Sequence, residues 1–158
     1  VVLKLSDLMR YLLYATKKRK QDLALELQSI QNYIDLERIR FNEELHISVS
    51  IQGNPKQKKI APMLLMPFVE NAFKHGVNHH IGAAEIILEA TVEGDFLNFR
   101  ISNTIPEKTS KSKKDIKNSG IGLTNVKKRL ELGYSAKDYE LTTKETNQLY
   151  IVELKIKV

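Results

Sequence analysis

The spacing of apolar residues changes period at Phe41, and this change constrains the fold more than any other feature of the chain. Before Phe41, apolar residues recur at i, i+3, i+4 and i+7, the spacing of one helical face. This pattern predicts helices over about 5–15 and 22–40. After Phe41, the segment from His46 to Ile51 alternates polar and apolar residues, as a half-buried strand does. We therefore expect a helical segment at 1–40 and a body with strands at 41–158.

The body alternates between strand and helix patterns. An apolar stretch at 60–76 contains Pro67, and because proline lacks the amide hydrogen, a regular helix is expected to start near it or to kink there. A second helix is expected at about 123–132. The strand patterns lie at 46–51, 85–92, 96–103, 139–144 and 149–158. Helices and an antiparallel sheet separated in this way predict a two-layer α/β sandwich.

The composition excludes several classes of protein. A length of 158 residues with 42% hydrophobic and 28% charged residues is typical of one folded domain. The absence of cysteine excludes disulfides and thiolate metal sites. The net charge of +6 is spread along the chain, which argues against nucleic-acid binding. The sequence has no apolar run of membrane-spanning length and no secretory signal, and its start at Val1 within a helical pattern indicates a piece of a longer protein.

Two neighbouring segments are suited to a loop that closes over a ligand. Residues 104–119 contain five lysines and little apolar surface, so a mobile loop is expected there. Next come Gly120 and Gly122, which open a helix. Glycines let the backbone approach an anion closely, and a helix N-terminus presents free N–H groups to it. A flexible hinge with Thr124 or Asn125 near the helix cap is the alternative.

The predicted helix after Pro67 has a polar side. Asn71, Lys74 and His75 lie at i, i+3 and i+4, so an amide, an ammonium and an imidazole point the same way. An oxygen ligand for a hard cation beside two phosphate-facing donors suits a magnesium–triphosphate site. The alternative is that Lys74 pairs with Glu70 and that His75 is a surface residue.

Four sequence motifs, taken in order, resemble a known family. They are LMRYLLY at 8–14, YIDLERIRF at 33–41, ENAFKHG at 70–76 and GIGLTNVKKRLEL at 120–132. The set is similar to the ATP-binding catalytic domain of two-component sensor histidine kinases of the LytS type. The resemblance implies the Bergerat fold, an α+β two-layer sandwich with a mixed, mainly antiparallel sheet. It also implies that residues 1–40 are the end of the dimerisation helix and its connector, and that 104–119 form the lid over the nucleotide.

The resemblance assigns a role to each matching position. Asn71 corresponds to the magnesium ligand, and Lys74 and His75 to residues that approach the phosphates. The ATP-binding residues implied are Asn71, Lys74, His75, Asn103, Gly120, Ile121, Gly122, Leu123 and Asn125. ATP and Mg²⁺ are the implied cofactors.

The implied function is transfer of the γ-phosphoryl group of ATP to a histidine on a helix N-terminal to this chain, for relay to a response regulator of the LytTR type. The parent protein is expected to be a homodimer anchored in the inner membrane. This domain is then expected in the cytoplasm, without direct contact to membrane or nucleic acid.

Three departures from the family pattern leave an alternative open. Asn103 stands where the family has an adenine-reading aspartate in a glycine-containing box, and Pro67 stands where many relatives of this fold have an acid or amide. The phosphoacceptor motif is missing around all four histidines: His46, His75, His79 and His80. The alternative is a degenerate domain that binds nucleotide weakly or not at all and acts as an interaction scaffold. A metal site at His75, His79 and His80 would require the helix to continue through Gly76.

Overall fold

The computed structural model describes residues 2–15, 20–41, 45–76, 84–105, 120–146 and 148–158. The helices are α1 (Val2–Ala15), α2 (Leu23–Phe41), α3 (Met66–Gly76) and α4 (Gly120–Gly133), with a 3-10 helix at Ala136–Asp138. The strands are β1 (Gln21–Asp22), β2 (Leu45–Gln52), β3 (Lys59–Ile60), β4 (Ala84–Glu93), β5 (Phe96–Thr104), β6 (Tyr139–Glu145) and β7 (Leu149–Lys157). All the predicted helices and strands are present, with small shifts at their ends.

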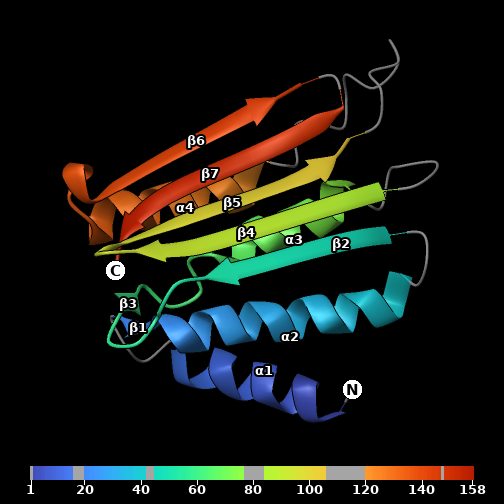
Figure 1. The fold of residues 1–158 in the computed structure, drawn as a ribbon, viewed down its shortest axis with the longest axis horizontal. Coiled ribbons are helices and arrows are strands. Elements are labelled where there is room, and N and C mark those ends of the chain that lie inside the picture. The colour runs from blue at the N-terminus through green and yellow to red at the C-terminus, as the bar shows by residue number, and fades with distance from the viewer. Residues whose placement is uncertain (1, 16–19, 42–44, 77–83, 106–119, 147) are drawn as a thin grey trace.

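One sheet forms the centre of the molecule, with strand order β2-β4-β5-β7-β6 (Figure 1). Strands β2 and β4 are parallel, with Ile47 opposite Ile86, whereas every other neighbouring pair in this sheet is antiparallel. A parallel pair needs a crossover, and the chain makes it through α3. The predicted fold class is therefore confirmed.

Helices α3 and α4 lie on one face of the sheet (Figure 1). Phe68 of α3 packs on Phe99 of β5 with ring centroids 6.1 Å apart. Val126 and Leu130 of α4 are buried in the same core. The α/β sandwich thus has its apolar core between these helices and the sheet.

The helical segment lies at the β2 edge of the sheet (Figure 1). Helices α1 and α2 pack against each other, and Lys4 of α1 donates to Asp35 of α2. Arg38 ties α2 to the sheet by donating to the carbonyl oxygen of Ile47 at 3.1 Å. One apolar stripe of α2 is buried: Leu23, Leu27, Ile30 and Ile34. None of the described helices is long and apolar enough to cross a bilayer.

A two-stranded ribbon, β1 with β3, joins the start of α2 to the stretch before α3. Gln21 pairs with Ile60 and Asp22 with Lys59. Two-residue strands are too short to produce an alternating pattern, so the sequence did not predict them. The ribbon holds the first turn of α2 beside the segment that precedes α3.

Candidate functional site

Helix α3 presents its three predicted site residues away from the core. Asn71 and His75 are half-exposed and Lys74 is exposed, whereas Val69 and Ala72 are buried. Within the described residues, the Asn71 carboxamide makes no hydrogen bond. Its oxygen is therefore available to a ligand.

Glu70 faces a different neighbour, helix α2. Burial raises the pKa of Tyr33 on α2, and the charges of Glu37 and Glu70 raise it further. Partial burial also raises the pKa of Glu70 itself. No ion pair joins Glu70 to Lys74 in the described part of the chain. The pairing considered as an alternative from sequence is therefore not found.

Asn103 lies at the end of β5, beneath the C-terminus of α3. Its side chain is 2% exposed. A Cβ atom on Gly76 would lie 2.9 Å from the Asn103 Cβ and 3.0 Å from its Nδ2, so only glycine fits here without a shift. Asn103 Nδ2 donates to the carbonyl oxygen of Thr104 at 3.1 Å. This close approach brings the end of α3 and Asn103 together.

Helix α4 begins at Gly120, three residues before the predicted start. Gly120, Ile121 and Gly122 therefore form its first turn. Leu123 is half-buried and packs against the core, and Asn125 is exposed. The start of α4 and the ends of α3 and β5 lie toward the same end of the sheet (Figure 1).

Two predicted features fall outside the described residues: most of the lysine-rich lid, at 106–119, and the pair His79 and His80. Thr104 is the last residue of β5, and the Ile105 N–H donates to the carbonyl oxygen of Gln148 at 2.9 Å. His46 is an exposed strand residue, as predicted. Among the described residues, no group of three or more acidic or histidine side chains could hold a metal ion.

Comparisons with known proteins agree with this arrangement. Residues 1–45 match the family described as histidine kinase. The sensor histidine kinase BtsS of Escherichia coli is 30% identical over 109 residues, which are 68% of this chain and 18% of BtsS. The sensor protein kinase HptS of Staphylococcus aureus is 34% identical over 76 residues, 48% of this chain and 14% of HptS. The chain belongs to the sensor histidine kinases. It spans less than a fifth of the length of these curated relatives.

Solved structures show the same fold for this histidine kinase domain. The catalytic domain of histidine kinase ThkA gives a TM-score of 0.60 at 12% identity, over 87% of this chain and 93% of that one. The histidine kinase domain of the blue-light activated kinase of Erythrobacter litoralis EL346 gives 0.60 at 14% identity, over 98% and 74%. These likenesses show that the chain has the fold of histidine kinase catalytic domains.

Sequence reasoning missed a buried polar cluster in the kinase domain. Glu26 of α2 is 0% exposed and accepts hydrogen bonds from the backbone N–H groups of Met63 and Leu65. Arg129 of α4 donates to the carbonyl oxygens of Pro62 and Met63. A signal was present, because Glu26 lies on the same helical stripe as the buried leucines of α2. An acid on an apolar stripe indicates a buried polar contact.

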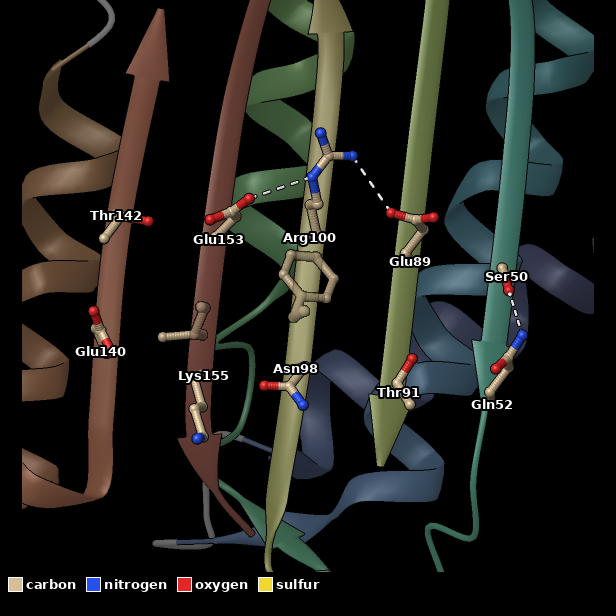
Figure 2. A pocket seen from close by; sticks show the side chains of 12 residues that line it. Ser50, Gln52, Glu89, Thr91, Asn98, Arg100, Glu140, Thr142, Glu153 and Lys155 are labelled. Atoms are coloured by element: carbon tan, nitrogen blue, oxygen red, sulfur yellow. Dashed lines mark hydrogen bonds and ion pairs between the residues drawn. The ribbon is translucent and has the colours of Figure 1, made fainter. Parts of the chain in front are cut away.

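The open face of the sheet carries a polar depression of about 510 Å³ (Figure 2). Arg100 lies between Glu89 and Glu153 there, 3.4 Å from an oxygen of each. The depression is on the face opposite α3 and α4, and it includes none of the predicted site residues. Arg100, Glu89 and Glu153 are already paired with one another, so the candidate site remains the helix-covered end.

Proposed function

We propose that this domain binds ATP with Mg²⁺ and supplies its γ-phosphoryl group to a histidine that lies N-terminal to the chain in its parent protein. One observation carries the proposal. The polar side of α3, the buried Asn103 and the glycine-containing first turn of α4 come together at one end of the sandwich.

The chemistry of the donor set fits a magnesium–triphosphate. Asn71 offers an uncharged oxygen, of the kind that a hard cation accepts alongside phosphate oxygens and water. Lys74 and His75 follow on the same helix as donors for phosphate oxygens. Gly120 and Gly122 put backbone N–H groups at the positive end of a helix dipole. When bound, the ion neutralises charge that develops on the phosphoryl group.

Asn103 is proposed to read the adenine. Its Nδ2 is engaged by the Thr104 carbonyl, which leaves Oδ1 to accept a hydrogen bond from the base amino group. A neutral amide accepts more weakly than the aspartate found in the family. We therefore expect lower affinity or weaker base selectivity than a carboxylate would give.

Phosphoryl transfer requires positioning and charge neutralisation more than a protein nucleophile. The domain alone is therefore expected to bind nucleotide without phosphorylating itself. The histidine kinase ThkA has been solved in complex with the response regulator TrrA, at a TM-score of 0.55 to this chain. By analogy, we propose relay to a response regulator, of the LytTR type, in a parent protein that is anchored in the inner membrane.

We also propose that the parent is a homodimer through the helical segment. Four apolar residues of α1 are well exposed: Val2 at 75%, Leu3 at 81%, Leu5 at 47% and Met9 at 55%. An apolar helix face of this kind is covered in assemblies. A parent protein that sediments as a monomer at all concentrations would contradict this.

The degenerate-scaffold alternative rests on Asn103 in the aspartate's place and on the missing first glycine box. Calorimetric titration with ATP, with and without Mg²⁺, separates the two readings. We expect magnesium-dependent binding that Asn71→Ala abolishes, while Asn98→Ala, a matched change on the open face, leaves it intact. No binding by folded wild-type protein would favour the scaffold.

Transfer itself requires a second experiment. The domain is mixed with a protein that carries the upstream histidine helix, and labelled ATP is added. Acid-labile phosphate on that helix is expected. Its absence, with both partners folded and ATP bound, would refute the kinase proposal.

A further inference from the structure

The loop formed by residues 61–65 leads directly into α3, and side chains from other elements bind its backbone. Glu26 Oε2 accepts from the Met63 N–H at 3.1 Å, and Oε1 accepts from the Leu65 N–H at 3.2 Å. The carboxylate therefore lies at the N-terminus of α3, where the helix dipole favours negative charge.

Arg129 of α4 and Tyr134, which follows α4, also bind the backbone of the 61–65 loop. Arg129 Nη1 donates to the Met63 carbonyl oxygen at 3.0 Å, and Nη2 donates to that of Pro62. The Ala61 N–H donates to the Tyr134 hydroxyl at 2.8 Å. Glu26 thus binds loop donors while Arg129 binds loop acceptors.

Met63 shows how firmly these contacts determine the loop. Its φ of 58° lies in the left-handed region, which a side chain of this size rarely adopts. Such a conformation persists only where the surroundings over-determine it. The hydrogen bonds from Met63 to Glu26 and from Arg129 to Met63 supply that constraint.

The 61–65 loop is also a junction, because it leads into α3 and is bound by side chains of α2 and α4. Asn71 lies six residues beyond Leu65, about 9 Å along α3, and Gly120 lies nine residues before Arg129, about 14 Å along α4. A rotation of either helix at the loop therefore displaces its site residues. Because Glu26 belongs to α2, which packs on α1, the helical segment shares the junction.

We propose that Glu26 and Arg129 are positioning residues, which act through the 61–65 loop to fix α3 and α4 relative to each other and to α2 in the arrangement that nucleotide binding requires. The inference rests on the proposed function. Apolar packing alone tolerates sliding, whereas these hydrogen bonds have defined directions.

The test uses the 158-residue chain with Glu26→Gln, Arg129→Met, their combination, and Arg129→Lys. Glutamine keeps the shape of Glu26 but has one acceptor oxygen for two N–H donors. Two matched controls change charge without touching the loop: Asp35→Asn, where α2 contacts Lys4 of α1, and Arg100→Met on the open face. Val152→Ala, at a buried residue of β7, controls for lost stability.

Two readouts are needed. The first is the affinity for Mg–ATP at pH 8, which we expect to fall by about 3- to 30-fold in each single variant. The effects should be non-additive in the double variant, and Arg129→Lys should recover part of the loss. The controls should stay near wild type. Val152→Ala shows how much affinity is lost through lower stability alone. If the Glu26 and Arg129 variants lose no more affinity than Val152→Ala at the same loss in melting temperature, the proposal is overturned.

The second readout needs no nucleotide. Backbone amide chemical shifts should change along α3 to Asn71 and at Gly120 and Gly122 in the Glu26 and Arg129 variants, and not in the controls. Shifts confined to residues 61–65 would overturn the positioning role. If wild-type protein fails to bind ATP, the proposed function is refuted, and the amide shifts alone decide whether the junction positions the two helices.

Discussion

The two ends of α3 are held in opposite ways. At its N-terminus, Met66 and Phe68 are buried, and the preceding backbone is bound by Glu26 and Arg129. At its C-terminus, Lys74 projects into solvent. One short helix thus carries a fixed anchor and an accessible polar end.

This difference separates stability from ligand chemistry. Groups that are fully buried and satisfied contribute to folding, and they leave no free capacity for a ligand. The half-exposed Asn71 and the exposed Lys74 add little to folding and remain available to a ligand. We therefore expect substitutions at the first end to change the free energy of unfolding, and substitutions at the second to change affinity.

The largest effect is expected at Phe68. Phe68→Ala removes a ring that is 1% exposed and packs on Phe99, so it should destabilise the domain by about 3–5 kcal/mol. Urea unfolding measures the change. Ile39→Ala, at an apolar residue that is 56% exposed, is the control and should cost less than about 1 kcal/mol. Equal costs would remove the basis for treating this end as the anchor.

The next largest effect is the pH dependence of the free energy of unfolding that Glu26 produces. Burial raises its pKa to about 7 from 4.5, against the lowering effects of the backbone N–H groups of Leu65, Met63 and Leu64 and the charge of Arg129. Because the folded pKa exceeds the unfolded one, the contribution of Glu26 is fully present below pH 4.5 and is lost as pH rises through 7. The loss amounts to about 3 kcal/mol at most.

Unfolding of wild-type and Glu26→Gln proteins between pH 4.5 and 8 isolates this contribution. As pH rises, the free energy of unfolding of the wild type should fall relative to that of Glu26→Gln. Asp35→Asn, another acid-to-amide change on α2, should leave the slope across this window unchanged. Parallel curves for wild type and Glu26→Gln would show that Glu26 does not titrate in this range.

Gly76 tests how closely the C-terminal end of α3 approaches the sheet. Gly76→Ala places a Cβ 2.9 Å from that of Asn103, so it should destabilise the domain by about 1–3 kcal/mol and also weaken ATP binding. Gly133→Ala is the matched control, because a Cβ there meets nothing within 4 Å. If both variants unfold alike, the approach of α3 to Asn103 is not tight.

The fold was predictable because its signal is local. The helical spacing before Phe41 and the alternation after it are properties of neighbouring residues, and they placed every longer helix and strand. The i, i+3, i+4 spacing of Asn71, Lys74 and His75 likewise fixed their shared side. Only the ends moved, as at α4, where Gly120 already belongs to the first turn.

The anchor could not be predicted in the same way. Glu26 and Leu65 are 39 residues apart, and no pattern in either segment identifies the other as its partner. The left-handed Met63 carries no glycine or asparagine signal. The contact of Gly76 with Asn103 also depends on how α3 crosses the sheet. Long-range polar contacts of this kind follow from packing, which local periodicity does not encode.

The smallest effect on stability is expected at Lys74. Lys74→Gln removes an exposed charge without a described partner, so the free energy of unfolding should stay within about 0.5 kcal/mol of wild type. Affinity for ATP should nevertheless fall about tenfold, the order expected for a hydrogen bond to a charged group. The loss should be larger for ATP than for AMP, because the ammonium acts on phosphate charge.

Lys137→Gln, in the 3-10 helix before β6, removes an equally exposed charge far from the candidate site. Titrations of both variants at two salt concentrations distinguish a direct phosphate contact from a general effect of net charge. A direct contact weakens ATP binding only in Lys74→Gln, and that difference persists at high salt because a close pair is screened less than distant charges. Equal losses in the two variants would mean that the accessible end of α3 does not contact the phosphates, and the division of α3 into an anchor and a ligand-binding end would then fail.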